Sequence, residues 1–145
     1  DLEVVCEAVK ERVDHSVDVS GMKVLLVEDN ELNIEVALML LEDAGVKADV
    51  AKNGKEAVDK FLASNEGDYD LILMDVMMPV MNGYEATKEI RESDHTQAKT
   101  IPIIAQTANA FQEDIKKVKE VGMNAHISKP IDEVNLLRVL SQFKK

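Results

Sequence analysis

Short apolar segments alternate along this chain with longer segments in which apolar residues recur every three or four positions. Residues 22–27 read Met-Lys-Val-Leu-Leu-Val, and residues 71–74 read Leu-Ile-Leu-Met. Runs of this length and composition are typical of strands buried on both faces of a sheet. Similar reasoning predicts further strands at 47–51, 101–106 and 125–128, and the segment at 101–106 is entered through Pro102, which suits a strand start.

The intervening segments predict helices at about 32–44, 53–62, 82–91, 112–121 and from 132 towards the C-terminus. Asn53 and Asn82 are each followed three residues later by a glutamate, which is the signature of a capped helix start. Gly45 and Gly122 follow two of the helical segments and are natural helix stops. The residues expected to face the core are Leu32, Val36, Met39 and Leu40 in the first helix and Val134, Leu137, Val139 and Leu140 in the last.

Five repeats of strand and helix predict an α/β fold. Such alternation is typical of a doubly wound parallel sheet with helices on both faces. The strands of such a sheet run parallel and are joined by right-handed crossovers, and the parallel orientation places the carboxyl ends of all five strands at one edge. Ligands bind outside that edge, and the functional residues are therefore expected at the strand ends.

Residues 1–20 differ from the rest of the chain. Leu2, Val5, Cys6, Val9 and Val13 have helical spacing. We interpret residues 1–20 as a linker or helical connector that leads to Gly21, and residues 21–145 as one domain. The chain begins without Met, and we expect it to be part of a longer polypeptide.

The net charge and the residue composition exclude some classes of binding partner. The formal net charge is 17 − 28 = −11, which argues against a protein that binds nucleic-acid backbones through clustered Lys and Arg. This charge suits a cation site or a basic protein partner. A single cysteine permits no internal disulfide, and no apolar run approaches the length of a membrane span. We expect a cytoplasmic domain that contacts neither nucleic acid nor membrane, although its parent protein can be membrane-anchored.

The predicted strand ends carry an unusual set of polar groups. Glu28 and Asp29 follow the first strand, Asp75 the third, Thr107 the fourth and Lys129 the fifth. Three carboxylates close together repel one another unless a hard cation such as Mg²⁺ lies among them. The ammonium and the hydroxyl suit an anion that arrives with the metal, and the third carboxylate can act as a nucleophile that forms an acyl phosphate.

Four motifs in this order resemble the receiver domain of two-component response regulators: "LLVEDNELN", "LILMDVMMPVMNG", "IIAQTANA" and "GMNAHISKPID". The residues within these motifs are most similar to those of receivers in hybrid sensor histidine kinases. The resemblance implies a flavodoxin-like sheet of order 2-1-3-4-5 and a role in phosphorelay signalling. It implies a histidine kinase or histidine phosphotransfer protein as donor, and contacts with other domains of the same polypeptide.

By this resemblance Asp75 is the phosphoacceptor. Asp29 and Asp75 bind Mg²⁺ together with Glu28, and the backbone carbonyl of Met77 is a further metal ligand. The resemblance also implies that the domain catalyses its own phosphorylation and dephosphorylation. Any kinase activity of a hybrid parent then lies outside this chain.

The resemblance assigns the remaining roles to three residues. Thr107 and Lys129 bind the phosphoryl group. Thr107 and His126 form the switch, in which the hydroxyl moves inward and the residue on the last strand rotates. His126 departs from the Tyr or Phe usual at this position, so its hydrogen bonding differs.

Other functions fit some of the same residues. A phosphatase with an aspartyl nucleophile also places Asp after an apolar strand, but it normally has a second acid where Met77 stands. A receiver that only docks without being phosphorylated, and a flavodoxin-like cofactor binder, are further alternatives. A nucleotide hydrolase is disfavoured because the chain has no G-x-x-x-x-G-K-[ST] loop. Taken singly, each residue has a structural explanation, such as a helix cap or a solvated charge.

Overall fold

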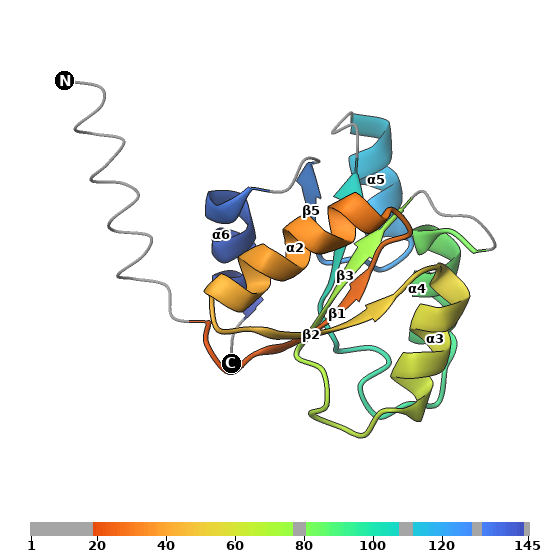
Figure 1. The fold of residues 1–145 in the computed structure, drawn as a ribbon. Coiled ribbons are helices and arrows are strands. Elements are labelled where there is room, and N and C mark those ends of the chain that lie inside the picture. Colours follow the sequence, from red (N-terminus) through yellow and green to blue (C-terminus); the bar gives the residue numbers. More distant parts are fainter. Residues whose placement is uncertain (1–18, 77–80, 108–111, 129–131, 144–145) are drawn as a thin grey trace.

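A parallel β-sheet forms the centre of the computed structural model, which describes residues 19–76, 81–107, 112–128 and 132–143. Within those ranges its strands are β1 (Lys23–Val27), β2 (Lys47–Ala51), β3 (Leu71–Asp75), β4 (Ile103–Thr107) and β5 (Ala125–Ser128). They are hydrogen-bonded in the order β2-β1-β3-β4-β5 (Figure 1). The predicted fold class and strand order are confirmed.

The helices that connect these strands are α2 (Glu31–Asp43), α3 (Gly54–Ala63), α4 (Gly83–Glu92), α5 (Gln112–Glu120) and α6 (Glu133–Phe143). Asparagine side chains define two of their starts, as predicted. Asn53 accepts a hydrogen bond from the backbone N–H of Glu56, and Asn82 accepts one from Glu85, both at 2.9 Å. Each cap satisfies one of the amide groups that a helix leaves without an internal partner.

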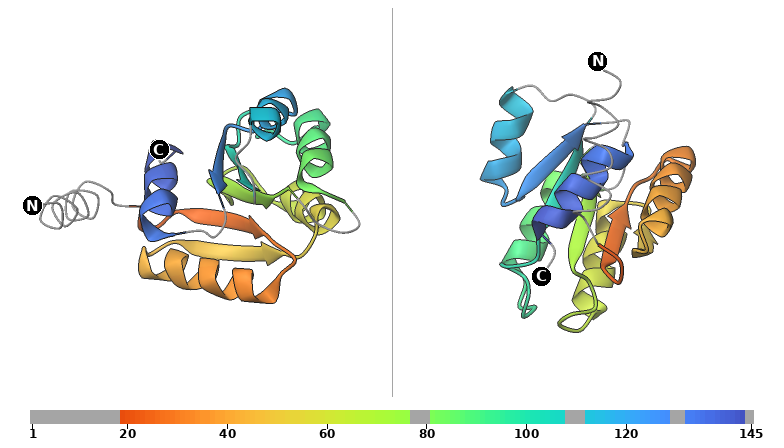
Figure 2. Two further views of the ribbon diagram at one scale, coloured as in Figure 1. Left: turned by 90° about the horizontal axis from the view of Figure 1, so that it is seen from above. Right: turned by 90° about the vertical axis from the view of Figure 1, so that its left-hand side faces the viewer.

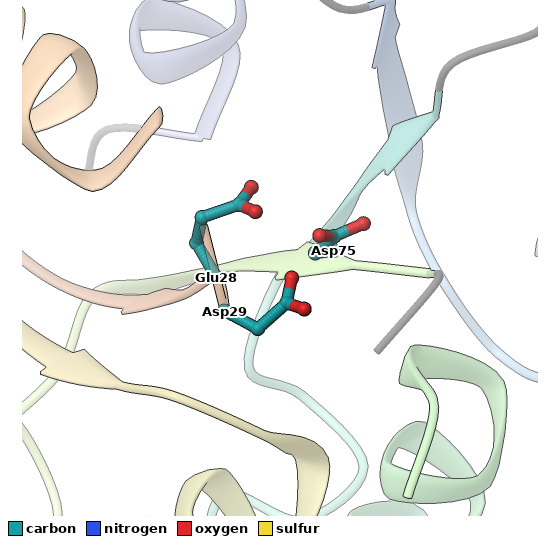
Figure 3. Close-up of side chains that lie close together, drawn as sticks. All are labelled: Glu28, Asp29 and Asp75. Atoms are coloured by element: carbon teal, nitrogen blue, oxygen red, sulfur yellow. The ribbon is translucent and has the colours of Figure 1, made fainter. Parts of the chain in front are cut away.

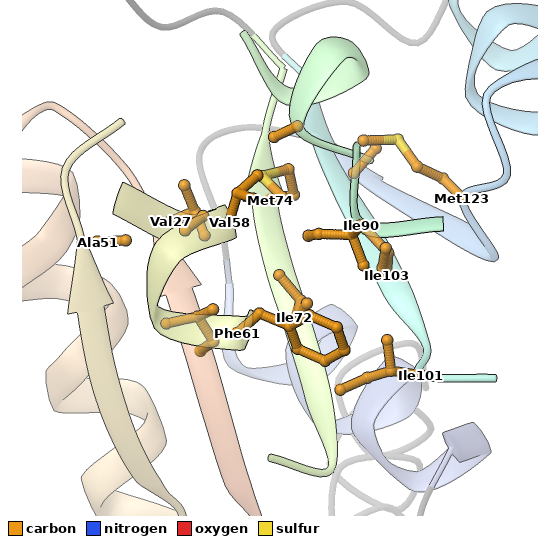
Figure 4. Packing of buried hydrophobic residues seen from close by; sticks show 14 of the residues in the cluster. Val27, Ala51, Val58, Phe61, Ile72, Met74, Ile90, Ile101, Ile103 and Met123 are labelled. Atoms are coloured by element: carbon orange, nitrogen blue, oxygen red, sulfur yellow. The ribbon is translucent and has the colours of Figure 1, made fainter. Parts of the chain in front are cut away.

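The helices cover both faces of the sheet, as a doubly wound fold requires (Figure 2). Helices α3, α4 and α5 pack on one face, where Phe61, Ile72, Met74, Ile90 and Ile103 are fully buried (Figure 4). Helices α2 and α6 pack on the other face, with Leu26, Leu41, Leu73, Ile104 and Leu140 in the core. Alternate residues of each central strand thus belong to different cores, because successive side chains of a strand point to opposite faces.

The predicted inward face of α2 is only partly correct, because Leu40 alone of the four predicted residues packs, partly buried, against the described core. Leu32 and Met39 are 68% and 57% exposed, whereas Ile34, Ala37 and Leu41 are buried. The helix carries apolar residues around most of its circumference, so two different stripes satisfy the three-to-four spacing. Packing against the sheet selects the stripe, and the sequence pattern does not.

The predicted inward face of α6 needs one smaller correction. Leu137, Val139 and Leu140 are buried as expected, but Val134, in the first turn of this helix, is 37% exposed. Its position at the helix start places it beyond the edge of the core.

Arg91, near the C-terminal end of α4, joins two loops that precede strands. Its guanidinium donates hydrogen bonds to the carbonyls of Ala98 and Gly122 and to the side-chain oxygen of Asn124, at 2.8–3.1 Å. The same Asn124 oxygen accepts the backbone N–H of Ile103 at 2.9 Å. Partial burial of the guanidinium lowers the pKa of Arg91. This network fixes the entries to β4 and β5 relative to α4.

Tyr69, just before β3, is buried, and its hydroxyl donates a hydrogen bond to Asp49 Oδ2 at 2.8 Å. Burial, followed by this hydrogen bond and the negative charges of Asp49 and Asp68, raises the pKa of Tyr69 to about 12. None of the helices in the described ranges is both long and apolar enough to span a membrane.

The predicted division at Gly21 stays a prediction. Val19, at the start of the described region, is buried beside Met22 in the core that α2 and α6 cover. The backbone N–H of Met22 donates to the carbonyl of Val19 at 3.2 Å. Packing against this face of the sheet therefore begins by residue 19.

Candidate functional site

Three carboxylates gather at the carboxyl edge of the sheet. Glu28 and Asp29 follow β1, and Asp75 is the last residue of β3. Each offers an oxygen atom, and these oxygens all lie within 4.8 Å of one another. Figure 3 shows the side chains extending from two strand ends towards a shared space. Glu28 and Asp75 are each only 1% exposed, whereas Asp29 faces solvent.

Strand register places these groups together. Val27 is the Cα partner of Met74, so the next residues along the two strands, Glu28 and Asp75, are neighbours at the strand ends. Both strands are apolar and buried, which holds the carboxylates at the rim. The side chain of Glu28 accepts a hydrogen bond from the backbone N–H of Asn30, which caps α2. The positive end of the α2 dipole therefore lies beside the acidic cluster.

Gly83, the first residue of α4, packs against the backbone of the Asp75 strand end. Its N–H donates a hydrogen bond to the carbonyl of Val76 at 3.2 Å. A Cβ atom at this position would lie 2.3 Å from the carbonyl oxygen of Asp75. Only glycine permits so close an approach. The sequence indicated a helix start at Asn82, but it gave no sign of this contact.

Thr107, the last residue of β4, brings a hydroxyl to the same edge. Asp75 is the Cα partner of Gln106, so Thr107 lies one residue beyond the level of Asp75 on the adjacent strand. Thr107 is 2% exposed, and its Oγ1 has no hydrogen-bond partner among the described residues. A buried hydroxyl without a partner is costly, so its presence points to a ligand that supplies one.

The remaining predicted residues divide into those that the structure describes and those that it does not. His126 lies in β5 and is the Cα partner of Ala105, so it faces the same side of the sheet as Thr107. Met77 and Lys129 lie outside the described residues. The structure therefore gives no position for the expected metal-binding carbonyl or for the expected ammonium group.

Sequence reasoning missed Gln106. This residue is 1% exposed and lies between Asp75 and Ile127 in the register of the sheet. Its Nε2 is 3.4 Å from the backbone carbonyl oxygen of Val27, so the donor and acceptor come from β4 and β1. The only signal in the sequence was a polar residue within an otherwise apolar strand.

The donor set fits a hard divalent cation. Mg²⁺ takes oxygen ligands and is commonly held by one or two carboxylates together with water and phosphate oxygens. Without a cation, the three negative charges repel one another across a partly desolvated rim. A phosphoryl group bound there would interact with the carboxylates through the metal, and it would contact the Thr107 hydroxyl directly. The arrangement suits transfer of a phosphoryl group to a carboxylate.

Comparison with known proteins gives a consistent result. The family model described as the response regulator receiver domain matches residues 24–141. The hybrid signal transduction histidine kinase B of Dictyostelium discoideum is 44% identical over 79% of this chain and 6% of its own length. The peroxide stress-activated histidine kinase mak1 of Schizosaccharomyces pombe is 40% identical over 84% of the chain and 8% of its own length. The chain thus spans only a small part of these relatives.

Two solved structures share the fold at appreciable identity. The receiver domain of a sensor histidine kinase from Pseudomonas aeruginosa, with a magnesium ion in its active-site cleft, is 38% identical with a TM-score of 0.76. That match covers 86% of this chain and 98% of the other. The structure of the Saccharomyces cerevisiae Ssk1 receiver domain in complex with the phosphotransfer protein Ypd1 contains a chain that is 32% identical to this one, with a TM-score of 0.75. That match covers 85% of this chain and 88% of the other.

Proposed function

Because this chain belongs to the response regulator receiver family, as a receiver homologous to those of histidine kinases, we propose that Asp75 accepts a phosphoryl group from a phosphohistidine. The observation that supports this most is the convergence of Glu28, Asp29 and Asp75 beside a buried hydroxyl. A nucleophilic carboxylate, a set of metal ligands and a hydrogen-bond donor are thereby present at one edge. These are the components that transfer to an aspartate requires.

In the proposed reaction, one oxygen of Asp75 attacks the phosphorus atom of the donor. A new O–P bond forms as the P–N bond to the donor imidazole breaks, and its electron pair returns to the ring nitrogen. Glu28, Asp29 and Asp75 would hold Mg²⁺, which neutralises charge on the phosphoryl oxygens when bound. Thr107 Oγ1 donates a hydrogen bond to one of those oxygens. Lys129 and the Met77 carbonyl complete the site by resemblance to the family.

The response to phosphorylation involves the other face of the sheet. Thr107 moves towards the phosphoryl oxygen, and His126 rotates towards the space that the hydroxyl leaves. Support comes from the register, which places both side chains on the face that α3, α4 and α5 cover. His126 is half-buried, so part of its ring lies at the surface. The altered surface then passes the signal to a partner or to another domain of the same polypeptide.

The donor is a histidine kinase or a histidine phosphotransfer protein. The exposed side chains of Leu32 and Met39 support a protein partner, because they lie two turns apart on the same side of α2, whose first turn follows Asp29. Acidic residues on the same helix, including Glu31 and Glu35, favour a donor whose contact surface is apolar with basic flanks. We also propose that this receiver domain works in the cytoplasm.

Phosphorylation from a small donor tests the role of Asp75 directly. The chain is incubated with Mg²⁺ and acetyl phosphate, and intact mass and a phosphate-retarding gel follow the addition of one phosphoryl group. The wild type and an Asp59→Asn control, changed at an exposed aspartate of α3, gain the group, whereas Asp75→Asn does not. Equal labelling of all three would refute the proposal. Steady release of phosphate from ordinary monoesters would indicate a phosphatase, and absence of labelling would indicate a receiver that only docks.

The docking of the donor has its own test. Leu32→Asp is expected to slow transfer from a phosphohistidine donor and to leave labelling by acetyl phosphate unchanged, since only the protein donor needs this surface. Leu62→Asp is the matched control, because Leu62 is 45% exposed on α3, which packs on the opposite face of the sheet. Equal slowing by both variants would show that α2 is not the docking surface.

A further inference from the structure

Gln106 is an anomaly in the core. It lies near the end of β4, which pairs with β3 on one side and β5 on the other, and it is 1% exposed. Its side chain faces the same side of the sheet as Ile104, two residues earlier, and its own Cα partners are the buried carboxylate Asp75 and the apolar Ile127. A buried amide costs about 1–3 kcal/mol unless hydrogen bonds compensate it. A leucine or methionine would fill the same position without that cost.

The hydrogen bond that Gln106 makes gives little stability in return. Nε2 lies 3.4 Å from the carbonyl oxygen of Val27, which is longer than the usual 2.7–3.2 Å of such a bond (about 2.9 Å is typical). A contribution to stability therefore does not explain why a glutamine occupies this position. The position of the acceptor offers an explanation, because Val27 is the last residue of β1 and directly precedes Glu28 and Asp29.

The geometry links this amide to the metal ligands. Glu28, which directly follows β1, Asp75 of β3 and Gln106 of β4 lie at neighbouring positions across the sheet, and by strand alternation they face the same side of it. The side chain of Gln106 starts from the strand on one side of Asp75 and ends at the strand on its other side. It thus spans the strand that carries the proposed phosphoacceptor.

We propose that Gln106 is a positioning residue, whose long contact with the Val27 carbonyl biases the end of β1 towards the arrangement in which Glu28 and Asp29 bind Mg²⁺ together with Asp75. The inference rests on the proposed function of this site. Outer groups that orient metal ligands commonly change metal affinity by about 10–100-fold. Gln106 acts through one backbone carbonyl, so the effect is expected at or below the lower end of that range.

Magnesium affinity and stability should change in opposite directions when the amide is removed. Gln106→Met keeps the length of the side chain and deletes its hydrogen-bonding groups. Isothermal titration with MgCl₂ is expected to show a Kd about three- to tenfold higher than that of the wild type. Urea unfolding without metal should show equal or greater stability. Labelling by acetyl phosphate should slow at limiting Mg²⁺ and recover at saturating Mg²⁺.

The controls separate positioning from general repacking. Ile127→Met makes an apolar exchange at the Cα partner of Gln106 and should leave the Kd for Mg²⁺ unchanged. Gln106→Leu serves as a second variant if Gln106→Met does not fold. An unchanged Kd in the Gln106 variants, an equal rise in Ile127→Met, or failure of both Gln106 variants to fold would overturn the inference. If the wild type itself binds no Mg²⁺, the proposed function fails as well.

Discussion

Asp29→Asn tests whether the acidic cluster stores repulsion that a cation relieves. The change keeps the shape of the side chain and removes one of three negative charges whose oxygens lie within 4.8 Å of one another. Asp29 is the exposed member of the cluster, so the substitution disturbs no packing. Among the described residues, two opposing effects decide its sign in the absence of metal: relief of repulsion, and loss of a charge near the start of α2.

Coulomb's law gives the size of the first effect. Two unit charges 4.8 Å apart repel by about 3.5 kcal/mol at an effective dielectric constant near 20 and by about 0.9 kcal/mol in bulk water. Asp29 faces two such charges, but its exposure shifts the true value towards the lower limit. A negative charge at a helix start contributes only about 0.3–1 kcal/mol. We therefore expect Asp29→Asn to raise the free energy of unfolding of the metal-free protein by about 1–2 kcal/mol.

Urea unfolding followed by circular dichroism measures this difference, first in EDTA and then with Mg²⁺. A ligand at ten times its Kd stabilises the folded state by about 1.4 kcal/mol. The wild type should gain this amount, and the variant should gain much less because it has lost a ligand. The advantage of Asp29→Asn in EDTA thus shrinks or disappears in Mg²⁺.

Two outcomes would contradict this prediction. If Asp29→Asn is no more stable than the wild type in EDTA, the repulsion is already screened by water. If both proteins gain equally from Mg²⁺, Asp29 is not a ligand. The control is Asp59→Asn, at an exposed position of α3 away from the cluster, which should change neither quantity.

Three further predictions concern stability. Because the folded-state pKa of Tyr69 is raised from 10.0 to about 12, its contribution is present below pH 10.0 and is lost as the pH rises towards the folded value. Urea unfolding against pH should show a loss of about 2 kcal/mol that Tyr69→Phe lacks. Arg91→Met removes the hydrogen bonds that hold two loops and should cost about 2–4 kcal/mol in urea unfolding, whereas Arg138→Met, at an exposed site, should cost less than about 0.5 kcal/mol. Gly83→Ala should destabilise by about 1–3 kcal/mol, because the new Cβ meets the Asp75 carbonyl oxygen; a gain in thermal stability would contradict this.

The sequence predicted the sheet well because each strand is specified locally. Residues 47–51 and 125–128 coincide with β2 and β5, and the asparagine caps before α3 and α4 were identified. The candidate site followed from the strand ends, since parallel strands bring their carboxyl ends to one edge. Glu28, Asp29 and Asp75 meet there because of register, which the apolar runs determine.

Features that depend on contacts between distant segments could not be predicted in this way. The inward face of α2 was partly misassigned because Leu32 and Ile34 both begin acceptable apolar stripes. The approach of Gly83 to Asp75 and the reach of Gln106 to Val27 join segments that no local pattern relates. Such contacts arise from how the elements pack, and only the folded chain reveals them.

Helix α4 is held at both ends by different parts of the molecule. Its first residue, Gly83, touches the backbone of Asp75, and near its other end Arg91 binds the loops that lead into β4 and β5. At about 1.5 Å per residue, this ten-residue helix is a rod roughly 15 Å long. Because both ends of α4 are in contact with other segments, a displacement of the Asp75 backbone is expected to shift the helix as a unit. That shift would reach the loops before β4 and β5, at the opposite edge of the sheet.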